Sequence, residues 1–231
     1  MRKKKKGTFF GVSLGVGHIM NVTVLALRVL NTVKNICIPI SHSGKNSEAL
    51  SRLEKMPVHL EDKNIVEVYL PMKKGDLTQY WNDGAEKIKR LLDNGEDVAF
   101  AGIGDLLHYG TFFYLENILK SKGFNTIYIP GITSYQALAE NLNIPLVQGK
   151  ESLLILPDDK VELRDISSFD SIVFMKKPDN KKLFEELNKT HVLYLGKNLG
   201  MRGEKFGEID DIENDIKNLP YFSLIIAKRR C

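Results

Sequence analysis

The chain is poor in cysteine and contains no long apolar segment. Its 231 residues include two cysteines, Cys37 and Cys231, so the sequence supports neither a disulfide framework nor a cysteine metal site. No apolar run approaches the roughly 20 residues needed to span a bilayer, and no signal-like apolar stretch follows the basic residues 2–6. We therefore expect a cytoplasmic protein with no membrane partner.

The charge pattern does not favour nucleic acid as a partner. The formal net charge of +4 comes largely from the two basic ends of the chain, while the middle is close to balanced. Such ends are usually solvated. Basic side chains at expected strand ends or loops either meet an anionic substrate or form an ordinary solvated surface; they are Lys73, Lys74, Arg164, Lys176, Lys177 and Lys197.

Short apolar runs alternate with longer amphipathic stretches, a pattern typical of a mostly parallel sheet covered by helices. A hydrophobic content of 43% is enough for a substantial core. Helical spacing is clearest over residues 77–93 and 111–121, and a glycine follows each segment. Strands are expected at residues 8–14, 35–40, 64–69, 97–101, 126–129, 152–156, 170–175, 191–195 and 221–227.

The second half of the chain has shorter connections between its strands and clusters of turn residues, which favour a mixed sheet with some antiparallel pairs. We therefore expect two α/β domains, residues 1–121 and 122–231, with a mostly parallel sheet in the first and a mixed sheet in the second. The boundary is placed at the charged, glycine-containing link of residues 120–123.

Two expected strands break into glycine-containing turns that carry polar side chains. Residues 102–112, GIGDLLHYGTF, follow the apolar run DVAFA, and residues 127–137, IYIPGITSYQA, form a strand that breaks at Pro-Gly. Such turns leave bare backbone at the carboxyl edge of a sheet, where small polar ligands are bound. The two edges together predict one cleft.

Each polar residue at these turns has a structural alternative. Asp105, Thr133 and Ser134 can cap helices as well as bind a ligand. His108 and Tyr109 lie within a turn of Asp105 and could face the same ligand, although aromatic residues in this stretch also suit a core. Met175 either lines a ligand pocket through its polarizable sulfur or packs in the core.

The first expected strand ends in another glycine-containing loop, GVSLGVG at residues 11–17. A dinucleotide fingerprint is not supported, because Met20 stands where G-x-G-x-x-G requires the last glycine. His18 follows this loop. It could act as a base or ligand, but a single histidine without a second ligand at metal spacing is more often a turn residue.

Taken in order along the chain, these motifs resemble the tetrapyrrole methylases, and within them the precorrin-2/cobalt-factor-2 C(20)-methyltransferases of cobalamin biosynthesis. The resemblance covers almost the whole length. It rests on the three strand-end stretches and on four later ones, NIPL at 143–146, ESLLILP at 151–157, VFMK at 173–176 and PYFSL at 220–224.

The resemblance implies a methyltransferase that uses S-adenosylmethionine as donor and forms a homodimer. The donor would lie in a cleft between the two domains, bordered by Ile103, Gly104, Asp105, Tyr109, Thr133, Ser134, Met175 and Ser223. The implied reaction methylates C-20 of precorrin-2 or cobalt-factor II. His18, His108 and Tyr109 are the candidates for receiving the proton that leaves, and no protein-bound metal is expected. The alternatives are methylation at another tetrapyrrole position, or a tetrapyrrole-binding homologue with impaired activity.

Two loops depart from the family pattern. The first loop usually reads Gly-Pro-Gly-Asp-Pro, and here residues 15–19 read Gly-Val-Gly-His-Ile. The second usually reads Gly-Asp-Pro-Ser-Leu-Tyr, and here Leu106, Leu107 and His108 replace Pro, Ser and Leu. Because proline fixes φ and lowers the entropy of the free loop, its absence predicts softer loops, above all on the substrate side.

Overall fold

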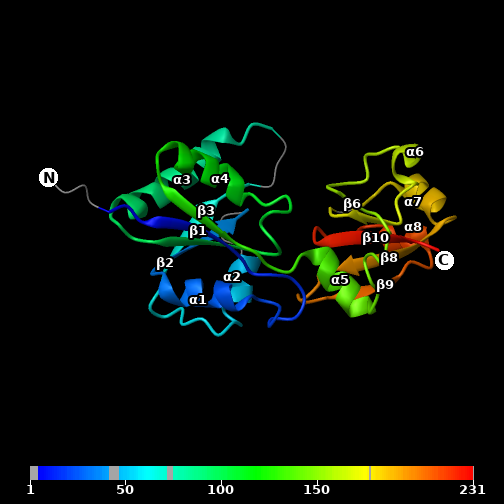
Figure 1. The fold of residues 1–231 in the computed structure, drawn as a ribbon, viewed down its shortest axis with the longest axis horizontal. Coiled ribbons are helices and arrows are strands. Elements are labelled where there is room, and N and C mark those ends of the chain that lie inside the picture. Colours follow the sequence, from blue (N-terminus) through cyan, green and yellow to red (C-terminus); the bar gives the residue numbers. More distant parts are fainter. Residues whose placement is uncertain (1–4, 42–46, 72–74, 177, 231) are drawn as a thin grey trace. The chain divides into compact units, whose positions relative to one another are not determined.

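The computed structural model describes residues 5–41, 47–71, 75–176 and 178–230. Lys73, Lys74, Lys177 and Cys231 lie outside this part of the chain. The chain divides into two compact units between Ile132 and Thr133, and each contains a five-stranded sheet (Figure 1). Two α/β domains, the first mostly parallel and the second mixed, were the architecture expected from the sequence, and this expectation is confirmed.

The first unit has strand order β3-β2-β4-β1-β5, and all neighbouring strands are parallel. Helices α1 and α2 lie on one face of the sheet and α3 and α4 on the other (Figure 1). Both faces of the central strands are therefore buried, which explains why β4 is apolar throughout. The elements are β1 Thr8–Ser13, α1 Val24–Thr32, β2 Asn35–Ile40, α2 Glu48–Leu53, β3 Asn64–Tyr69, α3 Thr78–Asp93, β4 Val98–Gly102, α4 Phe112–Ser121 and β5 Asn125–Ile129.

The second unit has strand order β6-β7-β10-β8-β9, in which only β6 and β7 pair in parallel. A core of large apolar side chains lies between this sheet and α6, α7 and α8. The elements are α5 Ser134–Leu142, β6 Leu153–Leu156, α6 Leu163–Ile166, β7 Ser171–Phe174, α7 Lys181–Leu187, β8 His191–Lys197, β9 Lys205–Glu208, α8 Ile212–Ile216 and β10 Ser223–Arg229.

The division between the units falls further along the chain than the 121/122 boundary expected from the sequence. Strand β5 pairs in parallel with β1, with Phe10 opposite Ile127, and so it completes the first sheet. Strand β9 was not expected at all. Its sequence, KFGE, is short and largely exposed at a sheet edge, so it has neither an apolar run nor a buried face to indicate it.

Within the described ranges, no helix is long and apolar enough to cross a membrane. In the same part of the chain, no group of three or more histidine, cysteine, aspartate or glutamate residues could hold a metal ion. Cys37 is fully buried in β2, and burial raises the pKa of its thiol to about 12, so it is a packing residue.

Candidate functional site

The loops that follow β1, β4 and β5 meet at the carboxyl edge of the first sheet. Strand β1 lies between β4 and β5, so the three loops leave from adjacent strands. The helices after β1 and β4 pack on opposite faces, which makes the β1/β4 edge a switch point of the topology. Open α/β sheets bind ligands at such edges.

The first two loops are joined through their main chains. Gly15 and Gly104 exchange N–H to carbonyl bonds, each 3.1 Å long, and form an isolated antiparallel bridge beyond the ends of β1 and β4. Both glycines have positive φ, 69° and 75°, a conformation that other residues adopt only with strain. The glycines are therefore required by the loop geometry itself.

The carboxylate of Asp105 joins the second loop to the third. Its Oδ2 accepts hydrogen bonds from the Tyr128 hydroxyl at 2.5 Å and from the Gly131 amide at 2.9 Å. Its Oδ1 accepts from the Leu107 amide at 2.8 Å and lies 3.4 Å from Nδ1 of His108. With 8% of its surface exposed, Asp105 binds the protein's own loops, whereas the N-cap of α4 is Thr111.

The electrostatics of this site favour an ionised Asp105. Burial alone raises the pKa of the carboxyl, but the hydrogen bonds that it accepts outweigh burial and hold its pKa below the ordinary 3.8. Burial, followed by the bond to Asp105, raises the pKa of the Tyr128 phenol. At neutral pH, Tyr128 therefore remains a donor to a charged acceptor, which gives a strong hydrogen bond.

Gly131 comes so close to the other two loops that a side chain has no room. A Cβ at this position would lie 2.7 Å from Cβ of Ser13, 3.0 Å from the Gly104 carbonyl oxygen and 3.2 Å from the Gly15 nitrogen. Ser13 also accepts a 3.0 Å hydrogen bond from the Leu106 amide through its hydroxyl. The three loops thus form one hydrogen-bonded layer.

Two of the three candidate proton acceptors belong to the second loop. His108 contacts Asp105 as described, and Tyr109 is 47% exposed with a positive φ of 58°. His18 is exposed at the end of the first loop, where its Nδ1 accepts a 3.2 Å hydrogen bond from the Met20 amide, as expected for a turn residue.

In the second unit, the expected donor residues lie near one end of the sheet. The Ser134 hydroxyl, at the first residue of α5, is 3.9 Å from Sδ of Met175, which follows β7. Ser223 begins β10, which runs antiparallel to β7, and its hydroxyl donates to the Pro220 carbonyl at 2.8 Å. Thr133 forms a capping box with Gln136 at the start of α5. The capping interpretation of Thr133 is therefore confirmed.

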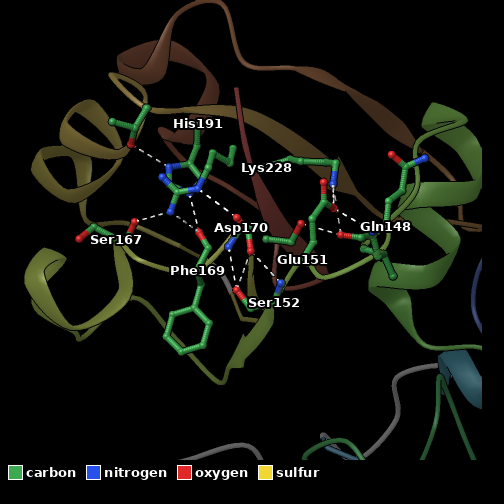
Figure 2. Close-up of polar contacts among 12 residues, drawn as sticks. Gln148, Glu151, Ser152, Ser167, Phe169, Asp170, His191 and Lys228 are labelled. Carbon is green, nitrogen blue, oxygen red and sulfur yellow. Dashed lines mark hydrogen bonds and ion pairs between the residues drawn. The ribbon is translucent and has the colours of Figure 1, made fainter. Parts of the chain in front are cut away.

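Another polar cluster in this unit contains Ser152, Asp170 and His191 but lacks the geometry of a catalytic triad (Figure 2). Asp170 accepts from both the amide and the hydroxyl of Ser152 at 2.8 Å, and from Nε of Arg229 at 3.2 Å. The fully buried His191 instead contacts the Phe169 carbonyl and Thr190. Without a serine to histidine contact, the cluster has no activated nucleophile. Its hydrogen bonds join the residues just before β6 and β7 to the end of β10.

Two of the basic candidates among the described residues lie at the end of the second sheet where β10 begins. Lys197 pairs with Ser223, and Lys176 follows Met175 just beyond β7, which runs antiparallel to β10. Nζ of Lys197 donates to the Asp215 carbonyl at 3.0 Å, and Arg164 lies in an exposed ion pair with Asp165. Lys176 is exposed. A further basic residue, Arg52, was not predicted. It lies under the first loop and donates to three of its carbonyl oxygens.

Comparison with known proteins matches residues 8–212 to the family described as Tetrapyrrole (Corrin/Porphyrin) Methylases. The chain is 39% identical over 226 residues to a probable cobalt-precorrin-2 C(20)-methyltransferase of Methanocaldococcus jannaschii, covering 95% of both chains. It is 25% identical to the cobalt-precorrin-2 C(20)-methyltransferase of Salmonella typhimurium, covering 97% of both. Among solved structures, a cobalt precorrin-4 methyltransferase has a similar fold, with a TM-score of 0.72 at 15% identity over 96% of this chain and 94% of that one.

Proposed function

Because this chain belongs to the tetrapyrrole methylases, we propose that it transfers a methyl group from S-adenosylmethionine to C-20 of precorrin-2 or cobalt-factor II in cobalamin biosynthesis. The observation that carries this proposal is the 39% identity to the Methanocaldococcus jannaschii relative over nearly the full length of both chains. A precorrin-2 C(20)-methyltransferase of Sinorhizobium, 26% identical over 181 residues, supports the same position of methylation.

The chemistry needs little from the protein beyond alignment. The donor sulfonium supplies a methyl group and leaves as a neutral thioether, while a new carbon–carbon bond forms at C-20 and a proton leaves that carbon. Holding two reactants in line can lower the activation barrier by roughly 7–11 kcal/mol, so no covalent nucleophile is required. Two observations agree with a reaction that needs no covalent nucleophile. The site of the first unit is built from main-chain loops, and in the separate Ser152 cluster the hydroxyl contacts Asp170 while His191 contacts the Phe169 carbonyl.

In the first unit, we propose that Ile103, Gly104 and Tyr109 border the donor, and that Asp105 acts mainly by shaping this loop. Gly104 suits such a role because its backbone is fixed by Gly15 and it presents no side chain. Asp105 has both carboxylate oxygens bonded to protein donors. The donor contacts of its loop are therefore expected to come from the main chain.

In the second unit, we propose that Ser134 and Met175 contact the donor, with Thr133 and Ser223 fixing the local backbone. Ser134 and Met175 already lie 3.9 Å apart, so one small ligand can touch both. The hydroxyls of Thr133 and Ser223 have partners within the protein, Gln136 and the Pro220 carbonyl. Their contribution is to place Ser134 and the start of β10.

The proton that leaves C-20 needs an acceptor, and we propose His108 ahead of His18 and Tyr109. Nδ1 of His108 lies 3.4 Å from the Asp105 carboxylate, on the same loop as Gly104, which is proposed to border the donor. We also propose that the protein is cytoplasmic and that it forms a homodimer; the family resemblance implies the dimer. Analytical ultracentrifugation of the purified protein tests the dimer.

The test is an anaerobic incubation of the protein with precorrin-2 or cobalt-factor II and isotopically labelled S-adenosylmethionine. We expect one labelled methyl group at C-20, located by mass spectrometry and NMR. Label at another ring position would assign the protein to a different tetrapyrrole methylation. Calorimetry that detects no S-adenosylhomocysteine binding at sub-millimolar concentration would exclude a methylase.

One observation favours a second function, a tetrapyrrole-binding protein with impaired methylase activity. The first loop carries Val16, His18 and Ile19 in place of the two prolines and the acid of the usual family loop. Macrocycle binding without methyl transfer to either substrate would support this function, and steady turnover would exclude it.

A further inference from the structure

Arg52, near the end of α2, is buried beneath the first loop with 7% of its surface exposed. Its Nε donates to the carbonyl oxygen of Leu14, Nη1 to that of Gly17 and Nη2 to that of His18, each at 3.0 Å. Three nitrogens of one planar guanidinium group thus donate to three carbonyl oxygens within the five-residue segment 14–18. The His18 carbonyl also accepts from the Asn21 amide at 3.0 Å.

Buried arginines are usually paired with carboxylates. Across the part of the chain that the structure describes, no carboxylate lies within 4.0 Å of the Arg52 guanidinium. Burial lowers its pKa, but an arginine remains charged at any physiological pH. Because the loop carbonyls provide the compensation for this buried charge, the charge and the loop conformation stabilise each other.

The segment that Arg52 binds is the one from which the usual prolines are missing. Gly17 has a positive φ of 75°, and Val16 and Ile19 stand at the proline positions of the usual family loop. Gly15 is fixed separately through its two bonds to Gly104. The far half of the loop, from Gly17 to His18, therefore depends on Arg52 for the rigidity that proline would otherwise give.

The loop leads into an exposed apolar surface. Met20 is 62% exposed, and Val24 and Leu25 at the start of α1 are 84% and 51% exposed. A flat macrocycle with apolar faces is a ligand that such a surface suits. The proposed donor residues of the first unit lie instead on the second loop, which Gly15 and Asp105 hold in place.

We propose that Arg52 is a positioning residue for the tetrapyrrole substrate: its buried guanidinium fixes the first loop by three carbonyl contacts and thereby sets the surface from His18 to Leu25. This inference rests on the proposed function for the identity of the substrate. It assigns Arg52 no contact with either reactant. Its effect is expected on tetrapyrrole recognition and turnover, with donor affinity unchanged.

The experiment compares Arg52→Met and Arg52→Lys with the wild type, and uses Arg229→Met as the matched control. Arg229 also donates to two main-chain carbonyls, those of Ser167 and Phe169, but it lies in β10 of the second unit. For each protein, calorimetry measures S-adenosylhomocysteine affinity, steady-state assays measure kcat and KM for the tetrapyrrole, and hydrogen exchange follows the amides of residues 15–21.

For Arg52→Met we expect kcat/KM for the tetrapyrrole to fall by about tenfold to a hundredfold, because misplacing a binding loop by about 1 Å can cost that much. We expect S-adenosylhomocysteine affinity within about threefold of the wild type, a difference below 1 kcal/mol. Exchange should become faster in residues 15–21. Arg52→Lys should lie between wild type and Arg52→Met, since an ammonium cannot reproduce the three-pronged geometry. Arg229→Met should change none of these readouts.

Three results would overturn the inference. One is unchanged kcat/KM and unchanged loop exchange in Arg52→Met. Another is an equal loss of donor and tetrapyrrole recognition, which indicates general unfolding, and the third is full activity in Arg52→Lys, which indicates that a point charge suffices. If the wild type transfers no methyl group, the proposed function fails, and the exchange of residues 15–21 still tests whether Arg52 fixes the loop.

Discussion

The substitution Asp105→Asn tests whether one carboxylate holds the strand-end loops together. The side chain keeps its shape but has one acceptor oxygen and one NH2 donor in place of two acceptor oxygens. If the NH2 group takes the Oδ2 position it faces the Gly131 amide, and if it takes the Oδ1 position it faces the Leu107 amide. In either orientation, one backbone N–H is left opposite another donor.

The expected loss of unfolding free energy is about 2–4 kcal/mol at pH 7. An unsatisfied buried donor costs about 1–3 kcal/mol, and the remaining bonds become weaker when the acceptor loses its charge. Urea denaturation followed by tryptophan fluorescence measures this loss in the first unit. The sequence contains one tryptophan, and Trp81 lies in α3, stacked on Tyr114 with ring centroids 4.1 Å apart.

The loss should also depend on pH. The pKa of Asp105 in the folded protein is below its ordinary value of 3.8, so its contribution to stability is complete above that value and disappears as the pH falls through the lowered folded pKa. The difference in unfolding free energy between wild type and variant should therefore become smaller as the pH is lowered to about 2.5.

Asp93→Asn is the control, because Asp93 also has a lowered pKa but forms an exposed ion pair with Lys89. Its effect should be much smaller. Equal stability of Asp105→Asn and wild type at pH 7 would refute the reasoning.

Three further substitutions probe the same loops and the start of α5. Gly131→Ala should lower the free energy of unfolding by about 1–3 kcal/mol and weaken S-adenosylhomocysteine binding, because the added Cβ would lie 2.7 Å from Cβ of Ser13. Urea denaturation and calorimetric titration measure the two effects. Gly207→Ala is the control, since a Cβ added there would have no atom within 4 Å. Tyr128→Phe should lower the free energy of unfolding by about 1–2 kcal/mol and raise the pKa of Asp105, because the carboxylate loses one hydrogen-bond donor. NMR titration measures the pKa of Asp105, and an unchanged pKa would count against the Tyr128 to Asp105 hydrogen bond. Thr133→Ala should lower the free energy of unfolding of the second unit by about 1 kcal/mol, because the capping box of α5 is lost. Denaturation followed by circular dichroism measures this change, and a stability equal to the wild type would show that the capping box contributes nothing.

Much of the fold could be predicted because its signals are local. The apolar runs over 35–40 and 64–69 coincide with β2 and β3, and the helical spacing over 77–93 matches α3 to within one residue. The edge strand β9 has no such signal, because KFGE is mostly exposed. The expected boundary at 121/122 differs from the division at Ile132, since nothing local shows that β5 pairs with β1.

The site was predictable in position and less so in its contacts. Motif order pointed to Gly104 and Asp105, but it did not show that both oxygens of Asp105 bind the protein's own donors. Tyr128 was expected only as part of the strand at residues 126–129, and Arg52 was not singled out in the sequence at all. The signal that could have drawn attention to Arg52 is the missing loop prolines, which leave a role for another source of rigidity.

The sequence by itself determined the two α/β units, the class of each sheet and the glycines at the strand ends, because periodicity and backbone freedom are properties of neighbouring residues. Only the tertiary structure decided which groups satisfy one another across the first unit: the Asp105 carboxylate with the third loop, and the Arg52 guanidinium with the first. Hydrogen bonds between residues 26 to 38 positions apart depend on how the strands are ordered in space, and strand order is a property of the whole packed sheet.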